Sequence, residues 1–217
     1  MLKNIIQRAL APVWSMSETS VDDLQRYSQE KILQQTRRGV TTMCVVFALL
    51  MIAELVLYLA IFDNSEHIYS CVMLAALALH IAFTSRSVDD QKTLHLLGMT
   101  LLVIGGTSFL LTAQGAGSFS TTTIVSISLL FMLIPLVPWG LRQGVTIAAL
   151  IYLTFTLSTW GSNSLFARDT LWVLQFLMLG TMSIALLIVA RNAQISKTDI
   201  RARFELESAN KKISEMS

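Results

Sequence analysis

Residues 40–62 read VTTMCVVFALLMIAELVLYLAIF, and Glu54 is the one charged residue in this stretch. An apolar run of roughly 18 or more residues with few charges predicts a helix that crosses a lipid bilayer. Five further runs follow, at about 68–84, 93–113, 121–139, 145–160 and 170–190. The connections between them are short, and short connections join antiparallel neighbours. The sequence therefore predicts an all-α polytopic membrane protein, an up-and-down bundle of six transmembrane helices.

The composition argues against an ordinary soluble domain. Of the 217 residues, 53% are hydrophobic and 14% are charged, and the mean hydropathy is +0.61. A soluble domain has about 25% charged residues, so this chain lacks the charge that covers a surface in water. The lipid bilayer is the expected partner. The net charge of +2 gives no indication of binding to nucleic acid.

The basic residues predict how the bundle is oriented. If both termini are cytoplasmic, fifteen of the sixteen Lys and Arg residues lie on the inner side, and Arg168 alone lies outside. Lys and Arg are enriched in cytoplasmic loops, so the split predicts six spans with both ends inside. The expected parts are a cytoplasmic leader at 1–38, the bundle at 39–190 and a cytoplasmic helix at 191–217.

The leader contains a short amphipathic pattern. Apolar residues recur at helical spacing between Ile5 and Trp14, with Lys3 and Arg8 among them, which predicts a helix in the membrane interface. Ser20 with Asp23 predicts the start of a second helix that leads into the first span. The segment is expected either to anchor and orient the first span or to act as a regulatory arm.

The C-terminal segment carries a heptad pattern. Its apolar positions are spaced 4, 3, 4 and 3 residues apart, at Ala202, Leu206, Ala209, Ile213 and Met216. Ile195 continues the seam upstream, and polar Asn192 and Asp199 also occupy seam positions, where they fix register at a cost in stability. The pattern predicts a parallel two-stranded coiled coil and hence a homodimer. The alternative is an amphipathic helix that packs on another segment.

The end of this helix also resembles a known family. Residues 204–217 read FELESANKKISEMS, which is similar to the linker helix before the catalytic domain of bacterial membrane-bound diguanylate cyclases. The matching positions are Glu205, Leu206, Glu207, Ala209, Asn210, Ile213, Met216 and Ser217. The six-helix module with a cytoplasmic leader is similar to the membrane sensor modules of the same proteins.

The resemblance implies a function for the whole chain. It implies a sensor domain in the bacterial inner membrane, which relays a ligand or membrane signal through the dimeric helix to a cytoplasmic output domain, a diguanylate cyclase. The GGDEF signature is absent, so no catalytic residue can be carried over, and the chain itself is not expected to be an enzyme. A small transporter is a third hypothesis, although no internal repeat supports it.

Glu54 is the main candidate for a site within the spans. An ionisable residue in a span is costly and suggests function. Tyr58 lies four residues later, on the same helix face, and Gln175 of the sixth span is expected at a similar depth. These three residues predict an outer pocket for an unknown small molecule. The alternative is a neutral or hydrogen-bonded Glu54 that ties helices together.

Two histidines suggest an alternative function. His80 and His95 flank the loop at 85–92, at similar depth near the cytoplasmic face. Two neutral imidazoles that face each other can ligate a b-type haem, which would make the chain a redox or gas-sensing protein. The competing interpretation is a pair of core or interfacial histidines. No other cofactor is expected.

Proline and glycine residues mark positions of packing. Pro135 and Pro138 are expected to end or kink the fourth span. Gly105, Gly106 and Gly180 are expected to let helices approach closely.

Overall fold

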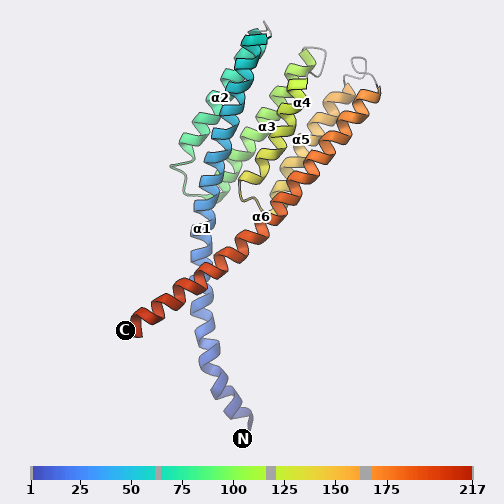
Figure 1. The fold of residues 1–217 in the computed structure, drawn as a ribbon. Coiled ribbons are helices and arrows are strands. Elements are labelled where there is room, and N and C mark those ends of the chain that lie inside the picture. Colours follow the sequence, from blue (N-terminus) through green and yellow to red (C-terminus); the bar gives the residue numbers. More distant parts are fainter. Residues whose placement is uncertain (1, 62–64, 116–120, 162–167, 217) are drawn as a thin grey trace. The chain divides into compact units, whose positions relative to one another are not determined.

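The computed structural model describes residues 2–61, 65–115, 121–161 and 168–216. Its elements are α1 (Leu2–Ile61), α2 (Ser65–Thr84), α3 (Gln91–Gly115), α4 (Thr121–Leu133), the 3₁₀ helix η1 (Ile134–Leu136), α5 (Leu141–Gly161) and α6 (Arg168–Met216) (Figure 1). No β-strand occurs within these ranges. The all-α fold class is therefore confirmed.

The chain divides into two compact units. One is the helical bundle, Gln35–Ala193; the other combines Met1–Gln34 with Gln194–Ser217 and is called the terminal unit below. The two long helices α1 and α6 each contribute residues to both units.

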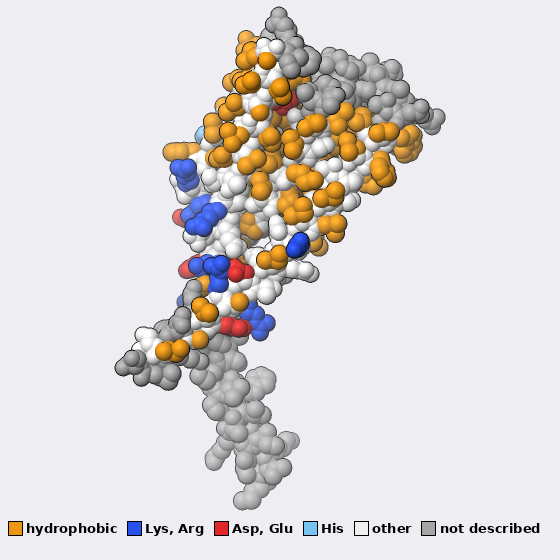
Figure 2. All heavy atoms as spheres, in the orientation of Figure 1, with side chains coloured by type: hydrophobic (Ala, Val, Ile, Leu, Met, Phe, Trp, Pro, Cys, Tyr) orange, Lys and Arg blue, Asp and Glu red, His pale blue; other side chains and the backbone are white. Residues whose placement is uncertain are grey.

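Within the bundle, neighbouring helices run side by side and α3 is central (Figure 1). It contacts α2, α4 and α5, and α1 packs on it through Phe47, whose ring lies 6.5 Å from that of Phe109. A Cβ added to Gly105 would lie 2.8 Å from the Phe47 ring. Hydrophobic side chains cover most of the bundle face seen in Figure 2. A bundle with apolar side chains both inside and outside is typical of a membrane protein.

Among the residues that the structure describes, five helices are long and apolar enough to cross a membrane, and α4 is shorter. The fourth span predicted at 121–139 is wrong in length, because the α-helix ends at Leu133. Pro135 has no N–H and its ring clashes with the carbonyl four residues earlier, so the chain tightens into the 3₁₀ turn. Val137 is then extended, and α5 starts at Leu141.

The segment after α4 is held by close contacts with its neighbours. The indole Nε1–H of Trp139 donates to the Ile134 carbonyl at 2.7 Å. Asn192 of α6 donates to the Pro135 carbonyl at 3.3 Å. Gly39 of α1 is also packed here, since a Cβ added to it would lie 2.7 Å from the Leu136 carbonyl oxygen.

The connection between α2 and α3 is fixed at the same end of the bundle. Arg37 of α1 donates from Nη2 to the Val88 carbonyl at 2.8 Å and to Asp89 Oδ1 at 2.7 Å. Asp90 caps α3, because its Oδ2 accepts from the Thr93 N–H at 2.9 Å and from the Thr93 hydroxyl at 2.8 Å. An Asp at this position satisfies a backbone donor that the helix leaves free.

Glycine plays different roles in the two spans where close packing was expected. Gly105 and Gly106 are packed against Phe47 and Leu130, as predicted. The prediction was wrong for Gly180, because a Cβ added there would meet no atom within 4 Å. That face of α6 is exposed in the bundle.

The terminal unit corrects the prediction for the leader. Residues 2–61 form one unbroken helix, so Ser20 and Asp23 do not begin a new one. Tyr27 of α1 packs on Phe204 of α6, with ring centroids 5.7 Å apart, and Lys31 lies over the Tyr27 ring at 5.3 Å. The side chains of the expected interfacial pattern lie outside the described residues.

The heptad seam lies on a different face of α6 from this contact. Ile200 is buried, whereas the seam residues Ile195, Ala202, Leu206, Ala209 and Ile213 are exposed. The side chain of Met216 lies outside the described residues. Asp199, at a polar seam position, accepts from Arg203 at 2.9 Å.

Candidate functional site

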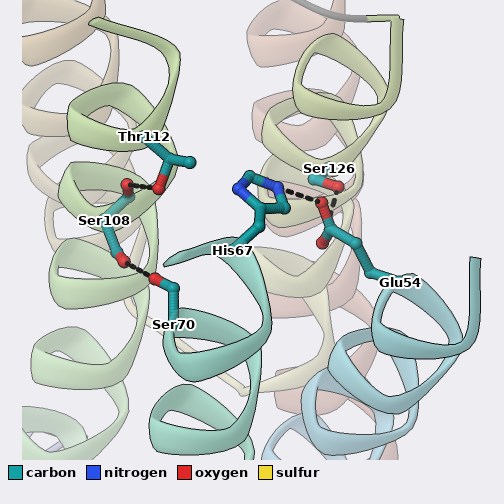
Figure 3. Close-up of polar contacts among 6 residues, drawn as sticks. All are labelled: Glu54, His67, Ser70, Ser108, Thr112 and Ser126. Carbon is teal, nitrogen blue, oxygen red and sulfur yellow. Dashed lines mark hydrogen bonds and ion pairs between the residues drawn. The ribbon is translucent and has the colours of Figure 1, made fainter. Parts of the chain in front are cut away.

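Glu54 is a buried carboxylate between the helices of the bundle, with 6% of its side chain exposed. Its Oε2 accepts from the Ser126 hydroxyl of α4 at 3.1 Å, and its Oε1 lies 3.6 Å from His67 Nε2 of α2 (Figure 3). The second distance exceeds that of a good hydrogen bond, and Oε1 accepts no hydrogen bond from any described residue. A buried charge without full hydrogen bonding is costly, so a hydrogen-bond donor to Oε1 would lower the free energy of the site.

His67 is held against Tyr58. Their ring centroids lie 3.8 Å apart at an interplanar angle of 47°, and both side chains are buried. Glu54 and Tyr58 are one helical turn apart on α1, so both face α2. The structure thus brings these two predicted residues together around a histidine.

Sequence reasoning missed both His67 and Ser126. His67 lies near the start of α2 and is buried. Tyr58 precedes residue 62 by four positions and His67 follows residue 63 by four. Residues equally far from a short connection between antiparallel helices are expected at similar depth, so this signal was present. The chain offers no comparable signal for Ser126.

A cavity of about 220 Å³ adjoins Glu54 between α1, α3 and α4. Glu54 and Ser126 are its two polar lining residues; the others are Phe47, Leu50, Met51, Ala53, Leu57, Phe109, Val125, Leu129, Leu130 and Leu133. Leu57, Val125 and Leu129 are also exposed on the outside of the bundle. The cavity therefore opens between α1 and α4, where α1 and α4 present apolar side chains.

A second polar contact lies beside this site, between α2 and α3. Ser70 and Ser108 share a hydrogen bond of 2.9 Å, and the Thr112 hydroxyl donates to the Ser108 carbonyl at 2.9 Å (Figure 3). The Ser70–Ser108 hydrogen bond joins two helices, as hydroxyl groups do in an apolar environment, whereas the bond of Thr112 lies within α3.

Gln175 does not face Glu54, which corrects the expected geometry of the pocket. Its Nε2 donates to the Thr159 hydroxyl at 3.0 Å, and its Oε1 accepts from the Thr156 hydroxyl at 3.2 Å. Both threonines belong to α5. Gln175 lines a separate cavity with Tyr152 and other residues of α5 and α6. Its amide group bonds to hydroxyls of α5, the helix that precedes α6 in the sequence, and not to α1.

The two candidate haem ligands lie in different surroundings. His95 is buried and its ring packs on Trp139, with centroids 5.0 Å apart. The cavity beside His95 is lined by α3, α5 and Trp139 and includes no residue of α2. His80 of α2 is exposed. The structure does not show the two imidazoles facing a shared space, and no described residues form a group of three or more potential metal ligands.

The comparisons with known proteins add no relative. No protein-family model, no curated protein and no solved structure matches this chain.

Proposed function

We propose that this chain is the sensor domain of a bacterial signalling protein, embedded in the inner membrane as a homodimer. In this proposal the bundle crosses the membrane six times, and both termini are cytoplasmic. A signal reaches the bundle, passes along α6 and controls a cytoplasmic output domain, a diguanylate cyclase.

The observation that carries the proposal is the continuity of α6. This helix runs without a break from Arg168 to Met216. Its first part is apolar and packs on α5, as the contact between Gly144 and Val189 indicates. A rigid helix transmits a rotation or a shift made at one end to its other end, which suits a relay and has no evident use in a transporter.

The exposed seam supports a dimer. Leu206 and Ile213 are 65% and 62% exposed in the single chain. The neighbouring pairs Arg201–Glu205 and Arg203–Asp199 are formed within the helix, so they leave the apolar seam free for a second copy. Parallel pairing on this seam would bring two output domains together.

A sixth crossing by α4 is consistent with its length. Thirteen α-helical residues rise about 20 Å, and three 3₁₀ residues add about 6 Å. The sum is near the roughly 30 Å of the hydrocarbon core. Six crossings place both ends on one side, in agreement with the split of the basic residues.

Changes of helix phase test the relay. With a diguanylate cyclase domain fused after Ser217, two alanines are inserted after Leu206. They rotate the following residues by about 200°, so cyclase output is expected to change several-fold. A seven-residue insertion at the same place nearly restores the phase and should restore the output. Equal output from all three proteins would contradict the relay.

Disulfide cross-linking in membranes tests the dimer. Leu206→Cys and Ile213→Cys are expected to cross-link, whereas Arg201→Cys, on the opposite face of α6, serves as the matched control. Equal cross-linking at all three positions, or none at the first two, would contradict the seam.

A further inference from the structure

The cavity beside Glu54 has the chemistry of a binding site for a cation. An ionised carboxylate only accepts hydrogen bonds. Ser126 already donates to Oε2. Oε1 lies 3.6 Å from His67 Nε2, which is too far for a good hydrogen bond, and it accepts no hydrogen bond from the described residues. A ligand with a positively charged N–H group would supply that donor and neutralise the buried charge. A carboxylate or a phosphate would be repelled.

The rest of the cavity lining is apolar and favours a ligand that is apolar apart from its charged group. Ten of the twelve lining residues named above are apolar, among them Phe47, Met51 and Leu130. The volume, about 220 Å³, is smaller than the roughly 300–1,000 Å³ of a pocket for a drug-sized molecule. It therefore suits a slender group, such as the first part of one alkyl chain.

The position of the opening indicates where the ligand comes from. Leu57, Val125 and Leu129 line the cavity and are exposed on the outside of the bundle. In a bilayer this surface faces lipid. A ligand reaches Glu54 through the membrane, and the part of its chain that the cavity does not hold stays among the lipid tails.

We infer that the cavity between α1, α3 and α4 binds a single-chain lipophilic amine, whose ammonium group is held by Glu54. The inference rests on the proposed function in one respect, since it names the ligand class that the sensor would detect. The binding itself requires neither the dimer nor the output domain.

Photolabelling of the full chain in phosphatidylcholine nanodiscs tests this site. The probe is a dodecylamine that carries a diazirine, compared with the diazirine-bearing alcohol and carboxylate of the same chain length. The amine is expected to label peptides of α1 and α4 at least tenfold more than either analogue, and unlabelled dodecylamine should compete. Equal labelling by the three probes would overturn the inference.

Three variants make the test specific. Glu54→Gln is expected to reduce amine labelling at least tenfold, whereas Glu205→Gln, an exposed acid of α6, should leave it unchanged. Leu129→Trp at the opening should block labelling while keeping Glu54, which covers the case in which Glu54→Gln does not fold. Labelling that survives both Glu54→Gln and Leu129→Trp would overturn the site.

Two further measurements distinguish the possible sources of the ammonium group and the possible reasons for lost labelling. Phosphatidylethanolamine also has an ammonium group, but it has a phosphate and two chains, so its addition to the nanodiscs should not compete; competition would overturn the assignment to a single-chain amine. Cross-linking of Leu206→Cys is measured in the same samples. Lost labelling with an intact dimer rejects this inference alone, whereas labelling without a dimer supports it and rejects the relay.

Discussion

Glu54 on α1 and His67 on α2 face each other inside the bundle, with Oε1 and Nε2 3.6 Å apart and 6% of each side chain exposed. Because the pair joins two helices away from water, each residue partly compensates the burial of the other. Removing one partner of a buried polar pair leaves the other unsatisfied, whereas replacing both with apolar groups is often nearly neutral.

This relationship predicts coupling between the two positions. We expect His67→Phe to lower the free energy of unfolding by about 1–3 kcal/mol, since buried Oε1 of Glu54 then loses the polar contact with Nε2 at 3.6 Å. Adding Glu54→Leu should recover much of that loss. Unfolding of the four proteins of this double-mutant cycle in detergent measures the coupling. Effects that add within about 0.5 kcal/mol would show that the residues act independently.

Gly39 and Gly180 predict opposite responses to the same substitution. Gly39→Ala should destabilise the bundle by about 1–3 kcal/mol, because the new Cβ would lie 2.7 Å from the backbone oxygen of Leu136. Gly180→Ala meets open space, so it should be neutral or slightly stabilising, as for a glycine inside a helix. Thermal unfolding compares the two variants, and similar losses in both would contradict the packing around Gly39.

The helices of this fold can be predicted from the sequence, but their rotation and shift against each other cannot. The apolar runs predict the helices because their length and lack of charge leave few alternatives. Glu54 stood out because an acid in such a run is costly. Its partners were missed because they depend on how helices are rotated and shifted against each other. The same limit explains why the partners of Gln175 were not predicted. Its amide group bonds to two hydroxyls of α5 and does not face α1.

Asp90 predicts a pH-dependent contribution to the start of α3. The hydrogen bonds from Thr93 lower the pKa of Asp90 below its ordinary value of 3.8, so the ionised carboxylate stabilises the folded state. This stabilisation is complete above the unfolded-state pKa and is lost as the pH falls through the folded-state pKa. Asp90→Ala should therefore lower the thermal stability at pH 7, and its difference from the wild type should narrow at pH 3.

Two variants serve as controls for the Asp90 prediction. Thr93→Val removes the hydroxyl donor but keeps the backbone donor, and should reduce the pH-dependent difference in part. Asp90→Asn keeps an acceptor oxygen and should lose less stability at pH 7 than Asp90→Ala. A gap between the wild type and Asp90→Ala that is equally wide at pH 3 and pH 7 would rule out the ionised cap.

The two hydrogen bonds of Arg37 are expected to differ in how strongly they hold the connection between α2 and α3. Asp89 is 91% exposed, and an exposed ion pair contributes roughly 0–1 kcal/mol. The bond to the Val88 carbonyl is partly buried, so its loss leaves a backbone acceptor without its partner. Arg37→Ala should therefore increase hydrogen–deuterium exchange in residues 85–90 strongly, whereas Asp89→Ala should change it little. If the two variants exchange alike, the ion pair and not the carbonyl bond holds this connection against α1.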